Sequence, residues 1–363
     1  MKNSNKILFF CPLPPPIGGQ AIISDIVYKI IQPSLLININ SRNKYFGTFK
    51  IIFNTFRIFL FYKIDLVYFT CSRSKKGVIK DVILLLLCKM YKIKVINHLH
   101  GNEVMDLFTG GVISSIILWT YKQIDTTIFV TEQQKQFIPA SLLSMKRVVV
   151  PNCYDPILEE IERDFSKSKN EKSILFISYL QKSKGIFIAL EVFEMIAKQY
   201  KDVTFHVAGK PLADYLMSEL DVKEIFESKF KKLDYEFPNR FIYHGVVEGN
   251  DKKDLFVNND IFLFPTYHKS ESFGIVNVEA MRAGNAIVTT DHNFLSNIVT
   301  KNEGLLVKPN DVNDTYNAVK YFLDNPKIML EIQRHNIKHA KENYSSDRFN
   351  KEIKKIFCQI LQE

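Results

Sequence analysis

The chain has 363 residues, of which 46% are apolar and 24% charged, so two globular domains are expected and disorder is not. Five scattered cysteines without a C-x-x-C pair argue against a disulfide framework and against a cysteine zinc site. The net charge of +9 is uneven, because residues 1–150 carry 19 Lys and Arg against 7 Asp and Glu, whereas the remainder carries 29 against 32. This basic half contains no recognisable nucleic-acid-binding motif, so we expect no nucleic acid partner.

The N-terminal apolar run is too short for a signal peptide and meets a proline cluster, so we interpret it as a first strand. The longest apolar run, residues 82–88, is far below the ~18 residues typical of a membrane span. The sequence therefore predicts a cytoplasmic protein that does not cross a bilayer.

Short apolar, β-branched runs recur along both halves of the chain, separated by segments long enough for helices. We expect strands at residues 6–11, 35–39, 65–70, 92–97, 126–130 and 147–150, and then at 173–178, 203–208, 240–244, 260–264, 286–290 and 304–307. This rhythm predicts an α/β protein with two tandem Rossmann-like, doubly wound domains.

The charged, low-complexity stretch 159–172 is interpreted as the linker, which gives a first domain over residues 1–158 and a second over 159–344. The chain ends in a predicted amphipathic helix, 347–361, that follows Ser345 or Ser346 as N-cap. Its apolar residues fall at helical spacing and need a partner surface: Phe349, Ile353, Ile356, Phe357 and Ile360.

The segment E-S-F-G-I-V-N-V-E contains two glutamates, Glu271 and Glu279, in a loop and the helix that follow the strand at 260–264. Carboxyl ends of strands are where open α/β sheets bind ligands. The backbone N–H groups of Phe273, Gly274 and Ile275 at the helix N-terminus favour an anion such as a diphosphate. Glu279 can accept hydrogen bonds from the hydroxyls of a ribose, and Glu271 from the hydroxyls of a sugar. Together these features suggest a nucleotide sugar, whereas an isolated glutamate pair would more often only complement the helix dipole.

In that context, residues 260–309 resemble the donor-binding signature of glycosyltransferase family 4, a group of retaining enzymes with the two-domain GT-B fold. The matching elements are D-I-F-L-F-P, E-S-F-G-I-V-N-V-E-A-M-R-A-G and G-L-L-V-K-P-N-D, with weaker matches at V-P-N, S-K-G, V-A-G and H-G. The resemblance implies a cleft between the domains, donor binding by the second domain, acceptor binding by the first, and a C-terminal helix, 345–363, that returns to the first.

The same resemblance assigns roles to individual residues of the second domain. Glu271 matches the glutamate that touches the transferred sugar, and Glu279 matches the one that holds the ribose. Lys184, in K-S-K-G, matches the lysine that neutralises the donor diphosphate, and Gly209, in V-A-G, belongs to the donor site. Taken alone, a lysine in a loop is usually only solvated.

One position departs from the family pattern, which usually has an arginine five residues before the lysine. Tyr179 stands there instead. Diphosphate binding is then one cation short, unless Lys182 or Lys210 compensates.

In the first domain, Gly18 and Gly19 match the family's glycine-rich loop, where backbone approaches the donor. His100, in H-L-H-G, matches a histidine near the reacting sugar. His98 would lie on the same face of a continuous strand, so it is the alternative.

No D-x-D motif occurs, so we expect no metal and no other cofactor. Charge on the departing diphosphate would then be balanced by Lys184, other cations and the helix N-terminus. The resemblance implies retention of configuration by attack on the same face as the leaving group, with the departing phosphate taking the acceptor's proton. We assign no covalent nucleophile.

The expected function is hexosyl transfer from a nucleotide sugar, with uridine favoured over guanosine as the base. Two alternatives stay open: a nucleotide-sugar epimerase on the same fold, and a nucleotide-sugar-binding partner that has lost catalysis.

Between Arg42 and Lys94 the chain has twelve Lys and Arg against two Asp, and within this region 47–63 intersperses cations with five phenylalanines. This composition is typical of an interfacial helix, although a crossover helix packed on the core is the alternative. We predict a peripheral enzyme at the anionic inner face of the membrane, with a lipid-linked saccharide acceptor, as in assembly of bacterial surface polysaccharide such as lipopolysaccharide or capsule.

Overall fold

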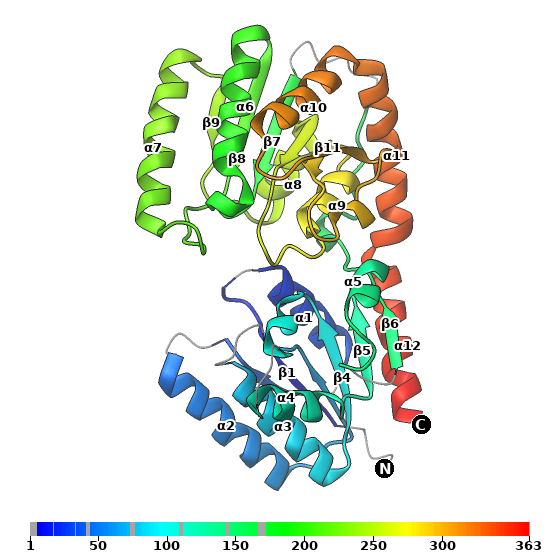
Figure 1. The fold of residues 1–363 in the computed structure, drawn as a ribbon. Coiled ribbons are helices and arrows are strands. Elements are labelled where there is room, and N and C mark those ends of the chain that lie inside the picture. The colour runs from blue at the N-terminus through cyan, green and yellow to red at the C-terminus, as the bar shows by residue number, and fades with distance from the viewer. Residues whose placement is uncertain are drawn as a thin grey trace. The chain divides into compact units, whose positions relative to one another are not determined.

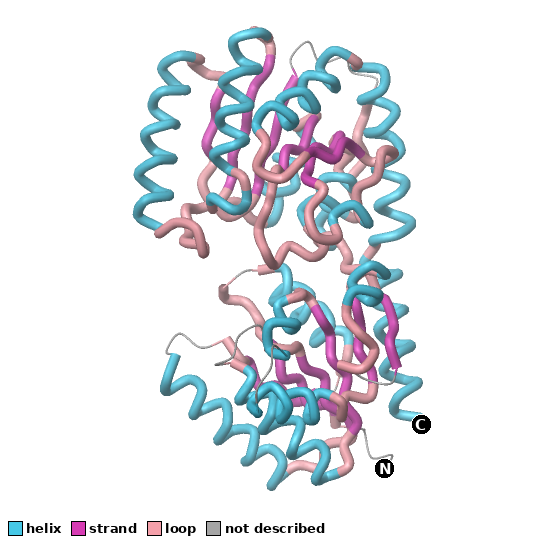
Figure 2. The backbone as a smooth tube through the Cα atoms, viewed as in Figure 1, coloured by secondary structure: helices cyan, strands magenta, loops and turns pink. Residues whose placement is uncertain are grey.

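The computed structural model describes residues 6–16, 18–32, 34–40, 44–72, 77–108, 112–142, 146–165 and 172–362. The chain divides into two compact units, each described here by itself. Unit 1 comprises residues 1–152 and 347–363, and unit 2 comprises residues 153–346. Within the described ranges each unit holds one parallel six-stranded sheet that is covered by helices (Figures 1 and 2).

The sheet of unit 1 has the strand order β2-β1-β3-β4-β5-β6. Its strands are β1 (Ile7–Cys11), β2 (Ser34–Asn38), β3 (Leu66–Phe69), β4 (Lys94–Leu99), β5 (Thr126–Phe129) and β6 (Lys146–Val149). Its helices are α1 (Gly19–Ile30), α2 (Lys44–Phe61), α3 (Val78–Tyr91), the 3-10 helix η1 (Glu103–Phe108), α4 (Val112–Tyr121) and α5 (Glu132–Phe137). The strand order reverses between β1 and β3, which makes the carboxyl ends of these strands the switch point of the sheet.

The sheet of unit 2 has the order β12-β11-β10-β7-β8-β9. Its strands are β7 (Lys172–Ile177), β8 (Val203–Ala208), β9 (Phe241–Tyr243), β10 (Ile261–Phe264), β11 (Ala286–Thr290) and β12 (Gly304–Val307). Its helices are η2 (Pro156–Leu158), η3 (Lys182–Lys184), α6 (Ile186–Gln199), α7 (Glu219–Glu236), α8 (Gly249–Asn258), α9 (Ile275–Arg282), η4 (Leu295–Asn297), α10 (Val312–Asp324) and α11 (Pro326–Tyr344). Here the order reverses between β7 and β10.

Each of the twelve predicted strands is present, with ends that shift by at most two residues. Strands such as β1, β3 and β10 are buried along their whole length, because helices cover both faces of a parallel sheet. The prediction of two doubly wound α/β domains is therefore confirmed.

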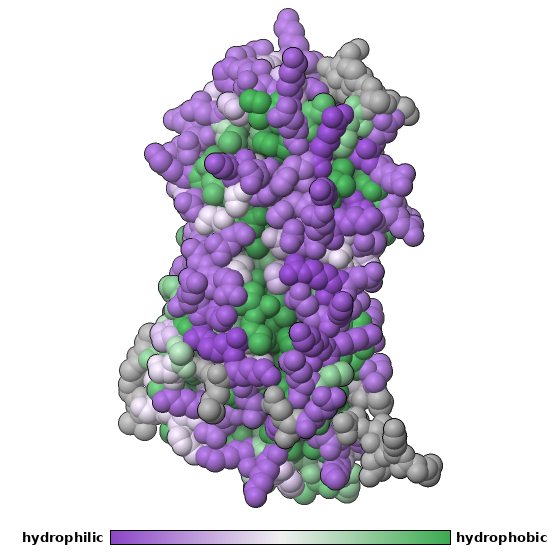
Figure 3. Space-filling model, turned by 90° about the vertical axis from the view of Figure 1, so that its right-hand side faces the viewer, coloured by the Kyte–Doolittle hydropathy of each residue, from purple (hydrophilic) through white to green (hydrophobic). Residues whose placement is uncertain are grey.

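The last helix, α12 (Ser346–Gln362), belongs to unit 1, as predicted. Phe357 packs with its ring centroid 6.2 Å from that of Phe9 and 5.9 Å from that of Tyr68. The apolar stripe predicted from the sequence is buried throughout: Phe349, Ile353, Ile356, Phe357 and Ile360. The opposite face of α12 is polar, and hydrophilic residues predominate on the side of the molecule that Figure 3 shows.

The predicted linker 159–172 is not a free connection where the structure describes it. Arg163 forms a buried ion pair with Asp260 (2.8 Å), and Ile161 is buried. Asp260 directly precedes β10, so this stretch is fastened at the amino end of a central strand of the unit 2 sheet. The division between the units falls between residues 152 and 153, not at 158 and 159, because η2 and the following residues pack on unit 2. Residues 166–171 lie outside the described ranges.

The five cysteines are free thiols, and only Cys358 is exposed. Over the described parts of the chain, no helix combines the length and the apolar composition needed to cross a bilayer.

Candidate functional site

The loops at the switch point of the unit 2 sheet bring Lys184 and Glu271 together. Lys184 ends η3 after β7, and Gly185 follows it with φ +81°. A Cβ on Gly185 would lie 2.2 Å from the carbonyl oxygen of Pro265, just after β10, so only glycine fits this approach. As a result the Lys184 ammonium forms an ion pair with the Glu271 carboxylate, which lies 87 residues further along the chain.

Glu271 is held as a carboxylate in a mostly buried position, with 13% of its side chain exposed. Burial alone would raise the pKa of Glu271, but the Lys184 ammonium outweighs this and the pKa is lowered. The backbone N–H of Gly274 also helps to lower the pKa of this carboxylate. The side chain is therefore ionised at neutral pH and ready to accept hydrogen bonds.

Gly274 caps the N-terminus of α9 with φ +64°. A Cβ at this position would approach Asn277 Nδ2 and Leu295 Cδ2 to 2.8 Å. Phe273 is buried, with its ring 5.9 Å from that of Tyr344. Gly274 thus lies beside the Glu271 carboxylate at the start of α9, and anion binding by the N–H groups of residues 273–275 stays a prediction.

Glu279 lies in α9 with only 3% of its side chain exposed. Its Oε1 accepts from Lys252 Nζ at 2.6 Å. Asp155 Oδ2 lies 3.5 Å from the same Lys252 ammonium. Burial raises the pKa of Glu279, and the Lys252 ammonium offsets this only in part. For Lys252, burial would lower the pKa, but the carboxylates of Glu279 and Asp155 outweigh burial, so the pKa of Lys252 is raised.

Sequence reasoning missed both partners of Glu279. Lys252 lies in α8, in the run G-N-D-K-K-D, which gives the signature of a solvated helix start and nothing more specific. Asp155 comes three residues after the V-P-N match, and that match was the only available signal.

The remaining predicted residues of unit 2 lie at the same edge of the sheet. Gly209 follows β8, and its N–H donates to the carbonyl of Gly245 at 2.6 Å. Tyr179, in place of the usual arginine, is half-buried after β7, and burial raises its pKa. Lys182 and Lys210 are both exposed, so they are free to move toward an anion.

In unit 1, Gly18 caps α1 after β1, and Gly19 is its first residue. A Cβ on Gly18 would meet no protein atom within 4 Å, so packing within the protein does not require glycine there.

The structure separates the two histidines that follow each other in H-L-H. His98 is fully buried in β4, and its Nδ1 lies 2.8 Å from the hydroxyl of Tyr68. Burial lowers the pKa of His98 to about 3, so it is a neutral core residue. His100 lies beyond the carboxyl end of β4, with its ring centroid 4.1 Å from that of His98, and it is also buried; its assignment to the site stays a prediction.

The family model described as "Glycosyl transferases group 1" matches residues 158–343. The chain is 25% identical over 261 residues to the phosphatidylinositol N-acetylglucosaminyltransferase gpi3 subunit of Schizosaccharomyces pombe, covering 70% of this chain and 53% of that protein. It is 20% identical over 259 residues to the alpha-galactosylglucosyldiacylglycerol synthase of Streptococcus pneumoniae, covering 69% and 65%. The chain thus spans about half to two thirds of the length of these relatives.

Among solved structures, Anabaena HepE in complex with UDP has a TM-score of 0.74 at 15% identity, over 98% of this chain and all of that one. This likeness shows the shared two-domain fold. The family match covers about half of the chain, including both glutamates, Lys184 and Gly209. The chain therefore belongs to the family of group 1 glycosyl transferases, which confirms the resemblance to glycosyltransferase family 4 that its motifs indicate.

Proposed function

We propose that this protein transfers a hexosyl group from a nucleotide-sugar donor, bound at the switch point of unit 2, with retention of configuration and without a metal. The observation that carries the proposal is the Lys184–Glu271 ion pair, after β7 and β10 at the switch point of the sheet. It places a cation for the diphosphate next to a carboxylate that can accept hydrogen bonds from sugar hydroxyls. A UDP-sugar is the favoured donor, in keeping with the UDP bound in the related fold of HepE.

In this mechanism the donor diphosphate competes with Glu271 for the Lys184 ammonium. Lys184 then balances the charge that grows on the leaving phosphate, where fixed charges contribute most. Glu271 becomes free to accept hydrogen bonds from hydroxyls of the sugar. The acceptor attacks from the face that the diphosphate leaves, and its proton passes to the departing phosphate. The roles that the family resemblance implies for His100, Gly18 and Gly19 of unit 1 stay predictions.

Incubation with a panel of labelled nucleotide sugars and a lipid-extract acceptor tests this proposal. A transferase releases nucleoside diphosphate and labels the lipid fraction, and analysis of the new anomeric bond tests retention. Return of an isomeric nucleotide sugar would instead identify an epimerase. Binding without turnover would identify a partner that has lost catalysis. Retained activity in a chelator would support metal independence.

Glu279→Gln is expected to weaken donor binding by at least about tenfold, because a hydrogen bond to a charged acceptor contributes roughly 1.5–3 kcal/mol. Lys252 keeps Asp155 as a partner in this variant, so the fold should be preserved. The measurement is donor Kd by calorimetry. Glu194→Gln is the matched control. Glu194 forms ion pairs with two lysines, each at 2.9 Å, and it lies outside the proposed site. An unchanged donor Kd in Glu279→Gln would remove Glu279 from the donor site.

We further propose that the acceptor is a lipid-linked saccharide and that unit 1 docks on the cytoplasmic face of an anionic membrane, as in assembly of bacterial surface polysaccharide. The names of the yeast and pneumococcal relatives point to lipid acceptors of those proteins, which supports this choice. The physical support is the outer surface of α2.

Helix α2 has two apolar faces. Ile51, Ile58 and Phe59 are buried against the core. Phe49, Phe53, Phe56 and Leu60 recur at steps of three and four residues, so they form one stripe on the opposite side, with exposed fractions from 45% to 72%. A crossover helix that packed only on the core would not need this second stripe.

The exposed stripe continues onto neighbouring helices of unit 1, since α3 lies beside both α2 and α4 (Figure 1). We call this surface the α2–α4 face; its exposed apolar residues are Phe49, Phe53, Phe56, Leu60, Phe61, Tyr62, Ile79, Leu86, Met90, Tyr91, Ile116 and Trp119. Exposed cations flank them: Lys50, Arg57, Lys63 and Lys89. Lys89 lies 4.0 Å from the ring centre of Trp119. Aromatic side chains interspersed with cations fit the interface of an anionic bilayer.

The protein is expected to sediment with anionic vesicles at low salt, and binding should fall as salt is added. Substituting Phe53, Phe56 and Leu60 together by Ser is expected to lower vesicle affinity about tenfold or more, because each side chain loses apolar area available for insertion. Co-sedimentation with vesicles of phosphatidylglycerol and phosphatidylcholine provides the measurement.

The matched control replaces two exposed apolar residues of α7 in unit 2, Leu220 and Tyr235, by Ser. This variant should bind vesicles like the unmodified protein. If the unmodified protein stays in the supernatant with anionic vesicles at low salt, the membrane proposal is wrong. A soluble acceptor, or a protein partner on the α2–α4 face, would then be preferred.

A further inference from the structure

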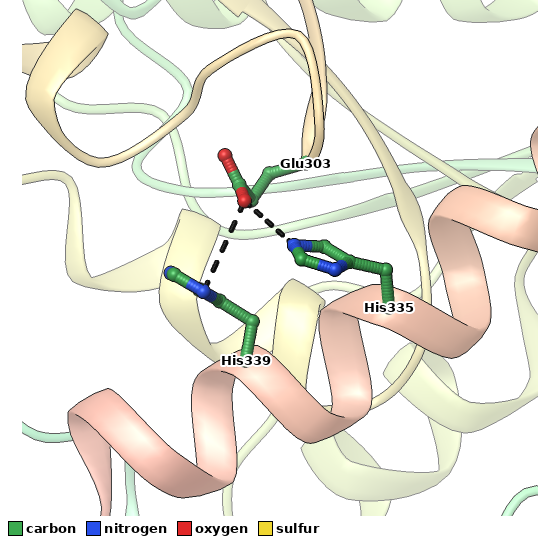
Figure 4. Close-up of side chains that lie close together, drawn as sticks. All are labelled: Glu303, His335 and His339. Atoms are coloured by element: carbon green, nitrogen blue, oxygen red, sulfur yellow. Dashed lines mark hydrogen bonds and ion pairs between the residues drawn. The ribbon is translucent and has the colours of Figure 1, made fainter.

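A second cluster of chemistry-bearing side chains in unit 2 lies apart from the residues assigned to transfer. Glu303 directly precedes β12, and His335 and His339 lie one turn apart on α11. Figure 4 shows the carboxylate and both imidazoles directed toward one another. His335 Nε2 lies 2.8 Å and His339 Nδ1 3.9 Å from the same carboxylate oxygen, Glu303 Oε1. All three ligand atoms lie within 4.8 Å of one another.

The carboxylate is oriented by a partner of its own. Its other oxygen, Oε2, accepts from the backbone N–H of Thr300 at 2.9 Å and from the Thr300 hydroxyl at 2.6 Å. Asn336 Nδ2 donates to the backbone carbonyl of Glu303 at 2.9 Å and so fixes that residue against α11. Glu303 is thus nearly buried and rigid, with Oε1 turned to the two imidazoles. Hydrogen bonds that orient a ligand in this way are characteristic of metal sites.

We infer that Glu303, His335 and His339 bind one zinc ion. Two histidines at i and i+4 with a carboxylate form a donor set that Zn²⁺ prefers, and three protein ligands leave a fourth position for water. Bonds of about 2.0–2.1 Å in a tetrahedron place ligand atoms roughly 3.3 Å apart, a value that lies between the two observed distances. Small side-chain rotations therefore suffice to build the site.

A hydrogen bond between His335 and Glu303 would explain the orientation of His335 but not that of His339. The His339 ring is nearly parallel to that of His335, with the ring centroids 5.3 Å apart. His335 Nε2 and His339 Nδ1 both face Glu303 Oε1. His339 Nδ1 also lies 3.4 Å from Asn343 Nδ2, a long contact that zinc would replace. The bound ion would tie the start of β12 to α11, the helix that packs on α9.

Equilibrium dialysis of the untagged protein against Zn²⁺, with a competing chromophoric chelator, tests this inference. We expect one equivalent of zinc, a higher melting temperature with zinc, and affinity at least about tenfold lower in His335→Ala and in His339→Ala. Both histidines are partly exposed, so these variants should fold. Bound Co²⁺ should show the visible absorption of a tetrahedral site, which a hydrogen-bonded cluster cannot produce.

The chain offers a matched control in His206 and His244, another parallel pair, with Nδ1 and Nε2 at 3.0 Å. His206→Ala combined with His244→Ala should retain the zinc stoichiometry. Absence of bound zinc would overturn the inference. So would zinc that remains in the His335→Ala, His339→Ala double variant, or zinc that is lost from the His206, His244 control.

Discussion

Deleting residues 346–363 is expected to leave unit 1 unable to fold, while unit 2 stays folded. The deletion removes five buried side chains of α12, each of which contributes about 1.5–3 kcal/mol through burial. Their sum is of the same order as the whole free energy of unfolding of a typical domain, about 5–15 kcal/mol. The loss falls on the core of unit 1, because Phe357 packs against Phe9 of β1 and Tyr68 of β3.

Hydrogen exchange followed by mass spectrometry measures this outcome for each unit separately. Peptides from β1 and β3 should lose protection, whereas peptides from β7 and β10 should keep it. Phe357→Ala gives a milder form, with an expected loss of about 3–5 kcal/mol in unit 1. Lys354→Ala, on the exposed face of the same helix, serves as the control. Loss of protection confined to unit 2 would contradict the prediction.

Lys184→Ala is expected to lower kcat about 10²–10³-fold with any accepted donor, if the protein acts as proposed. Such a factor is typical when one group that stabilises developing negative charge is removed. Because the interaction strengthens as the diphosphate leaves, the donor KM should change less than kcat. The removal also withdraws the ammonium that lowers the pKa of Glu271, so burial would then raise that pKa.

Steady-state kinetics with the best donor provide the measurement, after circular dichroism has verified the fold. Lys201→Ala is the control, because Lys201 is exposed and precedes the amino end of β8, away from the proposed site. Lys184→Arg should recover part of the rate, since it restores the charge without the compact geometry of an ammonium. A Lys184→Ala variant with unchanged kcat would move the role to Lys182 or Lys210.

The strands could be predicted from the sequence because most are short apolar runs rich in β-branched or aromatic residues. β8, β11 and β12 have the predicted ends. β11 is buried along its whole length, as expected for a strand of a parallel sheet covered on both faces. The apolar stripe of α12 likewise predicted a partner surface. Such patterns follow from local periodicity, which a single sequence contains.

Contacts between residues far apart in the chain could not be predicted in this way. Lys252 reaches Glu279 only because α8 and α9 lie on the same sheet, and its neighbours in the sequence are those of any solvated helix. The stretch 159–165 has the composition of a linker, yet Arg163 forms a buried ion pair with Asp260, which lies 97 residues further along the chain. The sequence favours His100 over His98 only through the family match, and it does not show that His98 is fully buried with its Nδ1 2.8 Å from the hydroxyl of Tyr68.

The assignment of α12 to unit 1 has a consequence for the order in which the chain matures during synthesis. Unit 2 is one continuous segment, so it can fold as soon as residue 346 has left the ribosome. The first strands of unit 1 are synthesised before unit 2. The core of unit 1 is completed only after α12 has been made, because Phe357, almost 350 residues after Phe9, packs on the aromatic side chains of β1 and β3. The nascent chain therefore carries this apolar surface without its partner helix while residues 153–346 are synthesised.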